Sequence, residues 1–490
     1  MNRISQLLLC ALTLSAPSFA DAPPPQTLPI AGDANHAAVE ETREERDARM
    51  AWWRDAKFGM FIHYGLYSGL AGEFRGVPGG AEWIQKNLEL DTDTYAAEAG
   101  PLFKPAPGCT EDWAELAKEA GCRYMVLTTK HHEGFAMFDT KLSDYSAPKL
   151  VGRDIVREFV DSARKRGMKV GFYHSVIDWH HPDYDNTICP DLCYPKNQQL
   201  MLKQKGIPRN QEAYQRFLHG QVRELLTQYG DISIIWWDYS QGAAEGERAW
   251  KAPSLIRMCR ELQPGIIMNN RLYAYSGFDT SFDGLQLDLR CGDYTTPEKR
   301  IPAAGYPGLD WESCMTVGDK WGYNRYDTRL KSPAVIIGQL QECAAKGGNL
   351  LLNIGPKADG SIPEGLVDVF KRVGAWMRVN GESIYGSQPC TLLNLPEGCM
   401  ASQVGENLYV FLPAGPKPEG YELKIKAQLL NAVEPSILGQ PESKVGMRRV
   451  EEPREGAEEP AAHLIFSIPA EAWSRAVEGM PVLKLELNNA

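Results

Sequence analysis

The sequence lacks the long apolar run that a membrane-spanning helix requires, which is ~20 consecutive residues. Its most apolar stretch, from Leu7 to Leu14, is too short to cross a bilayer. This stretch follows the positively charged Arg3 and is followed by small residues that end at Ala20, an order typical of a secretory signal peptide. We therefore expect a signal peptide at residues 1–20, export to the periplasm or secretion, and no membrane insertion.

Positive charge is also in short supply. The 52 lysines and arginines are outnumbered by 63 aspartates and glutamates, which gives a formal net charge of -11. Proteins that bind nucleic acids or anionic membrane surfaces carry clustered positive charge that neutralises phosphates. The composition therefore indicates no nucleic-acid partner and favours a neutral substrate. It does not indicate an oligomeric state.

Three motifs that bind metals or cofactors are missing. There are no paired C-x-x-C elements, no H-x-H on the first predicted strand, and no G-x-G-x-x-G after that strand. Structural zinc and a dinucleotide cofactor are therefore not indicated. Export permits disulfides, and Cys189 with Cys193 could close a loop, whereas Cys122, Cys259 and Cys343 lie in apolar or helical patterns typical of buried thiols. We expect no cofactor and no metal.

Strand-like apolar runs alternate with amphipathic helical runs through most of the chain. Trp113, Leu116, Ala117 and Ala120 follow the i, i+3, i+4, i+7 spacing of a helix with one buried face. This alternation predicts parallel strands with crossover helices, and the number of units favours a TIM-like (β/α) barrel over an open doubly wound sheet. The predicted strands are residues 58–64, 124–130, 169–174, 232–238, 266–270 and 349–355.

The helical period fades after about residue 386. Short strand-like segments separated by Pro and Gly then follow, for example at 408–412 and 463–468. The pattern predicts a leader segment at 21–45, a catalytic α/β barrel at 46–385, and an antiparallel β-sandwich at 386–490.

Histidines stand at the ends of several predicted strands. In a TIM barrel the active site lies at the C-terminal ends of the strands, and four of the nine histidines occupy such places: His63, His131, His132 and His174. Neutral imidazoles can hydrogen-bond to sugar hydroxyls, and the neighbouring tryptophans could pack on sugar C–H faces. A metal site built from these histidines is the weaker alternative.

Asp238 follows an apolar run that ends in Trp236-Trp237, which predicts a carboxylate at the mouth of the barrel. Retaining glycoside hydrolases pair such a nucleophile with a second carboxyl group about 5 Å away that acts as acid and then as base. Two residues in predicted loops after later strands could supply it, Glu298 and Glu312.

Several separated motifs resemble those of one family, the α-L-fucosidases of glycoside hydrolase family 29. They occur in order between about Met50 and Pro389: Trp53 to Gly65, Glu82-Trp83, Lys130 to Phe135, Trp236-Trp237-Asp238, Asn269-Asn270-Arg271, Trp321-Gly322-Tyr323 and Gly347 to Pro356. The resemblance implies a barrel with a β-sandwich, retention of configuration and no cofactor.

The resemblance also implies roles for individual residues. Asp238 would be the nucleophile, with Glu298 favoured as acid/base and Glu312 in reserve. The fucose ring would be bound by His63, Glu82, Trp83, His131, His132 and Arg271, with His174 at a position where the family often has tyrosine. The C6 methyl group would contact Phe61, Trp236 and Trp321.

We therefore expect an exo-acting retaining hydrolase that releases L-fucose from fucosylated oligosaccharides or glycoconjugates. Two alternatives stand beside it. One is a barrel that binds carbohydrate without cleaving it, and the other is a metal-dependent barrel hydrolase.

Overall fold

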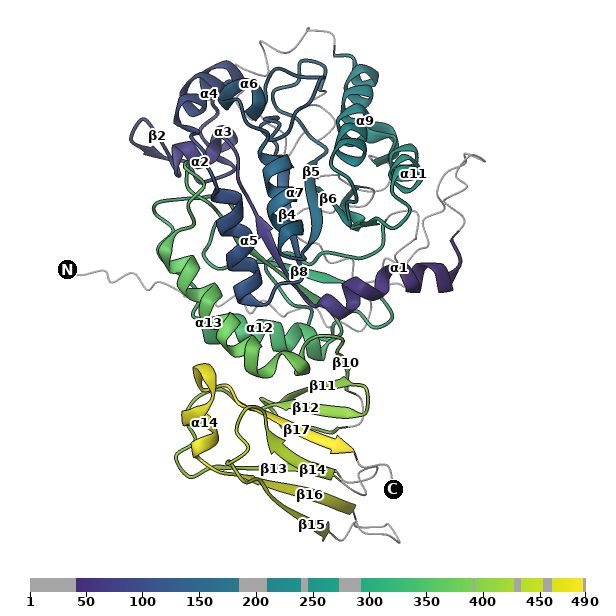
Figure 1. Cartoon of the computed structure of the whole chain (residues 1–490), viewed down its shortest axis with the longest axis vertical. Helices are drawn as coiled ribbons and strands as arrows, with labels where there is room; N and C mark the ends of the chain where they lie inside the picture. The colour runs from purple at the N-terminus through teal and green to yellow at the C-terminus, as the bar shows by residue number, and fades with distance from the viewer. Residues whose placement is uncertain are drawn as a thin grey trace, which may run out of the picture.

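The computed structural model describes residues 41–184, 209–238, 246–272, 292–390, 393–426, 433–452 and 461–487. Figure 1 shows a larger α/β domain followed by a smaller β domain that lies next to helices α12 and α13. The predicted signal peptide, most of the predicted leader, and the pair Cys189 and Cys193 lie outside the described residues.

A seven-stranded parallel sheet forms the centre of the α/β domain, in the order β7-β6-β5-β4-β1-β9-β8. Its strands are β1 (Phe58–Ile62), β4 (Tyr124–Lys130), β5 (Lys169–Ser175), β6 (Ile234–Asp238), β7 (Ile267–Met268), β8 (Glu312–Thr316) and β9 (Asn349–Ile354). The sequence predicted all of these strands except β8, whose polar residues read as a loop.

An irregular segment links the two edge strands of this sheet. Residues 294–298 form isolated parallel bridges with both sides, pairing Asn269 with Tyr294, Thr295 with Trp311, and Glu298 with Cys314. The segment thereby takes the eighth position of the ring. The predicted TIM-like α/β architecture is confirmed, with this irregular segment in place of a regular eighth strand. We call residues 294–298 the eighth stave of the barrel.

Helices cover the outside of the sheet: α5 (Cys109–Ala120), α7 (Ile155–Lys165), α9 (Gln211–Gln228), α11 (Ala252–Leu262), α12 (Pro333–Ala345) and α13 (Glu364–Asn380). The face predicted for α5 is buried. Helix α1 (Arg43–Ala56) precedes the first strand and begins with a capping box, in which Thr42 and Glu45 satisfy each other's backbone N–H groups. None of the helices in the described part of the chain is long and apolar enough to cross a membrane.

The interior of the barrel is filled mainly by aromatic side chains, including Phe61, Tyr124, Tyr173 and Trp236. Successive strand residues point to opposite faces of a sheet. Each strand therefore divides its side chains between this interior and the layer beneath the helices, and that division decides which residues can reach the site.

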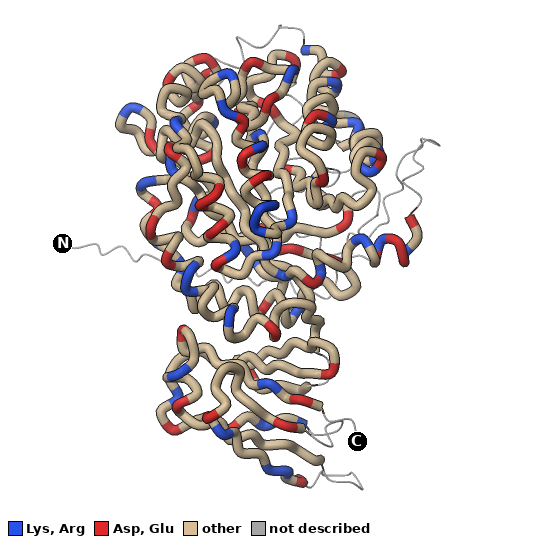
Figure 2. Tube along the Cα trace, viewed as in Figure 1, with Lys and Arg blue, Asp and Glu red and all other residues tan. Residues whose placement is uncertain are grey.

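The C-terminal domain consists of two antiparallel sheets. The five-stranded sheet has the order β10 (Gln388–Pro389), β11 (Met400–Val404), β12 (Asn407–Phe411), β17 (Val482–Leu487) and β14 (Val433–Ile437), and the three-stranded sheet has the order β13 (Tyr421–Lys426), β16 (Ala461–Ile468) and β15 (Gly446–Glu452). Both sheets contribute to one core, in which Val410 and Leu485 share a cluster with Leu423 and Phe466. The predicted antiparallel sandwich is confirmed. Figure 2 shows acidic and basic residues interspersed over both domains.

Candidate active site

Asp238 is the last residue of β6, and its carboxylate is held on two sides. Arg271, in the 3-10 turn after β7, places Nη1 2.8 Å from Oδ1, and the Tyr173 hydroxyl donates to Oδ2 at 2.7 Å. The residues before Asp238 in β6 are fully buried, whereas the Asp238 side chain keeps 14% of its surface exposed. The strand thus delivers one partly accessible carboxylate to the C-terminal end of the barrel.

Glu298 lies on the other side of the same guanidinium. Arg271 Nη2 is 3.0 Å from Oε2 of Glu298, and the indole N–H of Trp321 donates to Oε1 at 3.2 Å. The Glu298 side chain also keeps 14% of its surface exposed. Because Asp238 and Glu298 contact one planar cation, the two carboxylates lie close together at one end of the barrel.

Arg271 itself is fixed by its surroundings. Its Nε donates to Thr296 Oγ1 at 2.8 Å, and its guanidinium carbon lies 4.5 Å from the centre of the Trp236 ring. The side chain is buried. An arginine that is stacked and hydrogen-bonded in this way has little freedom to move, so it sets the spacing of the two carboxylates.

Three histidines surround the carboxylates. His63 Nδ1 is 2.7 Å from Asn353 Oδ1, and its ring stacks on Trp321 at 5.1 Å. His132 Nδ1 is 2.7 Å from Ser175 Oγ, and its Nε2 is 3.7 Å from Asp238 Oδ2. The His131 ring lies 4.0 Å from the His132 ring.

Burial keeps these histidines uncharged. It lowers the pKa of His63 to about 3 and lowers the pKa of both His131 and His132 well below the ordinary value. Neutral imidazoles can both donate and accept hydrogen bonds, which suits recognition of sugar hydroxyls. Within the described ranges, no group of three or more His, Cys, Asp or Glu side chains is arranged to hold a metal ion.

Glu82 and Trp83 join the site from the loop before α3 (Ile84–Asn87). The backbone N–H of Gly322 donates to Glu82 Oε2 at 2.9 Å, while burial raises the pKa of the Glu82 carboxyl. The Trp83 ring lies 4.9 Å from His132. Glu82 thus connects its own loop to the loop that carries Trp321.

An apolar aromatic surface lies beside these polar groups. The ring of Phe61 is 5.0 Å from Trp236 and 5.9 Å from Trp321. Of the predicted site residues, the structure therefore brings together His63, Glu82, Trp83, His131, His132, Asp238, Arg271, Glu298, Phe61, Trp236 and Trp321.

His174 is not part of this group. It follows Tyr173 in β5, and the alternation of side chains turns it toward the outer layer, where Nδ1 is 2.9 Å from Thr129 Oγ1 and the ring is 6.4 Å from Phe138. The prediction that His174 hydrogen-bonds to the sugar is therefore wrong. Tyr173 points inward and reaches Asp238 instead.

Glu312 is likewise displaced from the position that the sequence predicted. It is the first residue of β8 rather than part of a loop, and it is completely buried inside the barrel. Its carboxyl group accepts hydrogen bonds from the Tyr124 hydroxyl and, at 3.1 Å, from the Trp236 indole N–H. Burial raises its pKa to about 7. Glu312 lies beneath the aromatic surface, so its use as a reserve acid/base is not supported.

Sequence reasoning missed two residues of the site, Tyr173 and Asn353. Each lies in a segment that had been recognised, since Tyr173 is in a predicted strand and Asn353 is in the Gly347 to Pro356 motif. Local sequence carried no signal for either residue, because it does not say which face of a strand is the interior. The structure shows that Tyr173 pairs with Trp236, and Asn353 pairs with Phe61, across neighbouring strands.

The fold and the site together define a class of enzyme. Two carboxylates that lie close together at the C-terminal end of the barrel, among neutral hydrogen-bonding groups and aromatic rings, are typical of a glycoside hydrolase. The comparison with known proteins narrows this class. A sequence profile described as Alpha-L-fucosidase matches residues 28–382, and the chain belongs to the α-L-fucosidase family.

Individual relatives agree with this assignment. The chain is 31% identical to the tissue alpha-L-fucosidase of Homo sapiens over 365 residues, which cover 69% of this chain and 70% of the relative. The structure of α-L-fucosidase isoenzyme 1 from Paenibacillus thiaminolyticus is 36% identical, has a TM-score of 0.77, and is matched over 91% of this chain and 100% of that one.

A third relative bears on the mechanism. It is an α-L-fucosidase from Bacteroides thetaiotaomicron whose structure holds a trapped covalent intermediate formed with 2-fluoro-fucosyl fluoride. This protein is 27% identical, with a TM-score of 0.73 and coverage of 90% of this chain and 97% of that one. The matches confirm the predicted family and, with it, a retaining hydrolase of α-L-fucosides.

Proposed function

We propose that Asp238 and Glu298 carry out the two displacements of the retaining reaction. In the first, Asp238 attacks the anomeric carbon while the bond to the leaving oxygen breaks and Glu298 transfers its proton to that oxygen. In the second, Glu298 takes a proton from water, the water oxygen attacks the anomeric carbon, and the Asp238 carboxylate departs. α-L-Fucose is released and both carboxyl groups return to their starting states.

The observation that carries this assignment is the bridging of both carboxylates by Arg271. Arg271, which also contacts Glu298, and the Tyr173 hydroxyl hold the Asp238 carboxylate in a fixed orientation for attack. The indole N–H of Trp321 and Arg271 orient the Glu298 carboxyl group toward the same place.

The surrounding residues fit a fucose ring. His63, His131, His132 and Glu82 offer hydrogen-bonding atoms to the ring hydroxyls, and the Phe61, Trp236 and Trp321 rings offer an apolar surface to the C6 methyl group. One methyl contact discriminates by only ~1–3 kcal/mol. The buried polar groups therefore supply most of the selectivity for fucose, and they favour exo cleavage of fucosylated oligosaccharides or glycoconjugates.

Azide rescue of two variants tests the roles of the two carboxylates. Asp238→Gly should lose kcat by roughly 10³-fold or more on 4-nitrophenyl α-L-fucoside, and added azide should restore turnover with β-L-fucosyl azide as product. Glu298→Gln with azide should give the α-azide, because Asp238 still forms the covalent intermediate. The opposite pairing of products, or no rescue of either variant, would contradict the assignment.

We also propose that the mature chain is exported after cleavage behind Ala20. The N-terminal pattern supports this proposal, as does a substrate class that is displayed outside the cytosol. Intact mass measurement of protein expressed with its full N-terminus checks it, since export predicts a mature form that begins at Asp21. Retention of residues 1–20 in the active protein would contradict it.

A further inference from the structure

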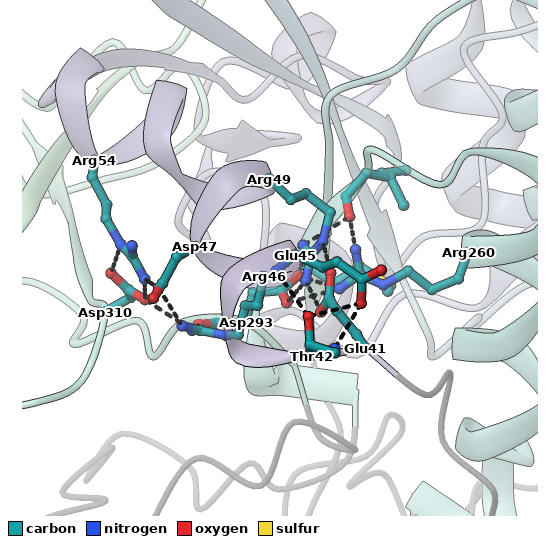
Figure 3. Close-up of polar contacts among 12 residues, drawn as sticks. Glu41, Thr42, Glu45, Arg46, Asp47, Arg49, Arg54, Arg260, Asp293 and Asp310 are labelled. Atoms are coloured by element: carbon teal, nitrogen blue, oxygen red, sulfur yellow. Dashed lines mark hydrogen bonds and ion pairs between the residues drawn. The ribbon is translucent and has the colours of Figure 1, made fainter.

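The opposite end of the barrel from the site holds a second group of charges, drawn in Figure 3. We call it the floor clamp and define it as Arg46, Arg49, Arg54, Arg260, Asp293 and Asp310. Three of its arginines come from α1 and the fourth comes from α11. Its two aspartates stand near the two ends of one stretch of chain, residues 293–310.

Asp293 is almost completely enclosed, with 1% of its side chain exposed. Arg260 Nη2 lies 2.7 Å from both carboxylate oxygens, Arg49 Nη2 lies 2.8 Å from Oδ1, and the Met268 N–H donates to Oδ2 at 2.7 Å. Burial opposes ionisation of this carboxyl, but Arg260 and Arg49 outweigh it and hold its pKa below the ordinary value. The Asp293 end of the stretch is therefore pinned.

The Asp310 end is tied to the same helix. Arg54 donates to both oxygens of Asp310, at 2.7 and 2.9 Å. Arg46 Nη2 reaches Asp310 Oδ2 at 2.8 Å and also the backbone carbonyl of Asp293 at 2.7 Å. Arg46 is thus the member of the clamp that joins the two ends directly.

The stretch between these ends contains the eighth stave of the barrel, which carries Glu298. The chain runs from Asp293 at the floor toward the catalytic end of the barrel. On the way, Thr296 accepts a hydrogen bond from Arg271, and Glu298 then lies beside Asp238 on the same arginine. The backbone just before the stave is tightly packed, because a Cβ at Gly292 would lie 2.4 Å from the carbonyl oxygen of Asn269. Backbone hydrogen bonds to both neighbouring strands hold the stave along its length, such as Asn270 N–H to the Tyr294 carbonyl and Lys299 N–H to the Cys314 carbonyl. The floor clamp adds anchors at its lower end, where Asp293 and Asp310 lie.

We propose that Arg46 is a positioning residue for Glu298: by joining Asp293 to Asp310 it fixes the height of the stave and hence the place of the proton that Glu298 delivers. This inference rests on the proposed role of Glu298 as acid/base. Arg46 acts through the backbone of the stave and has no contact with Asp238 or Glu298.

Two substrates separate a positioning effect from general damage. 4-Nitrophenyl α-L-fucoside has a leaving group that needs little protonation, whereas methyl α-L-fucoside releases an alkoxide that needs it fully. For Arg46→Gln we expect kcat/KM on the methyl fucoside to fall by about tenfold and kcat/KM on the nitrophenyl fucoside to change by less than about twofold, since a well-placed general acid contributes ~10²–10⁴-fold.

Arg372→Gln serves as the matched control. Arg372 also makes a two-pronged ion pair, with Glu478 at 2.7 and 2.8 Å, but it lies on α13 far along the chain from the stave. This variant should leave the ratio of the two kcat/KM values unchanged. If Arg46→Gln does not fold, Arg46→Lys keeps the charge but loses the planar fork, and the same change in ratio is expected from it.

Glu298→Gln distinguishes the possible failures. Suppose that Glu298→Gln lowers kcat/KM on the methyl fucoside selectively, whereas Arg46→Gln and Arg46→Lys lower kcat/KM on both fucosides equally or not at all. The positioning role of Arg46 is then overturned, and the acid role of Glu298 stands. If Glu298→Gln itself lowers both rates equally, the proposed acid role fails and the positioning role fails with it.

Discussion

Both ends of the barrel hold carboxylates paired with arginines, but the carboxylates differ in their exposure and in their number of partners. At the catalytic end, Asp238 and Glu298 share one arginine and each keeps 14% of its side chain exposed. At the floor, Asp293 contacts two arginines, Arg260 and Arg49, and a backbone N–H, and it is 1% exposed. Saturated, buried ion pairs are costly to break, whereas carboxylates with remaining exposure can meet a substrate. The degree of burial and the number of hydrogen-bond partners, rather than the residue type, distinguish Asp293 from Asp238 and Glu298.

The floor should show the largest effect on stability. Asp293→Asn leaves Arg49 and Arg260 facing a neutral amide in a buried place, so we expect the free energy of unfolding to fall by about 3–5 kcal/mol. Urea denaturation followed by tryptophan fluorescence measures this change, with Asp238→Asn as the matched change at the catalytic end. A smaller loss for Asp293→Asn than for Asp238→Asn would reverse the comparison.

Glu312, between the two ends, should link stability to pH. Its pKa is about 7 in the folded protein against an ordinary value of 4.5, so the folded state binds this proton more tightly than the unfolded state. Its contribution is complete below pH 4.5 and is lost as the pH rises through 7, with a limit of roughly 3 kcal/mol from the size of the shift.

Glu312→Gln removes this proton equilibrium and imitates the protonated acid. We expect the variant to lose less stability than the parent between pH 5 and pH 8, with little difference between them at pH 5. Melting temperatures of both proteins at the two pH values provide the test. Parallel losses in parent and variant would show that Glu312 ionises normally.

The smallest effect is expected at the catalytic end itself. Tyr173→Phe removes the hydrogen bond to Asp238 but leaves the ring in its aromatic cluster. We expect kcat/KM to fall by about tenfold, equivalent to ~1.4 kcal/mol, and to fall equally for the methyl and nitrophenyl fucosides because the nucleophile is affected and the acid is not. A selective loss of kcat/KM on the methyl fucoside would show that Tyr173 supports the acid Glu298 instead of the nucleophile.

Elements with a strong local period were predicted from the sequence. The buried face of α5 follows the spacing of Trp113 to Ala120, and β4 and β9 contain short apolar runs, residues 124–127 and 350–352, of the kind expected in buried strands. Elements without such a period were missed. β8 opens with Glu312 and Ser313, and the stave at 294–298 makes only isolated bridges, so neither carries a strand signal of its own.

The site was predicted to a similar extent. The carboxylate at the end of β6 and the histidines after β1 and β4 could be identified because parallel strands deliver their last residues to one end of a barrel. The exchange of Tyr173 for His174 could not, since adjacent strand residues face opposite sides and local sequence does not say which side is the interior.

By itself, the sequence determined the alternation of strands and helices, the sandwich that follows, and the ordered motifs that mark the family, because these are local patterns or strings of residues. Only the tertiary structure decided where Glu298 and Glu312 lie. Both are glutamates in segments without a strand signal of their own, but the eighth stave places Glu298 beside Asp238, whereas Glu312 at the start of β8 is buried below Trp236. That choice depends on contacts between residues far apart in the chain, such as Arg46 with Asp310, which no local pattern records.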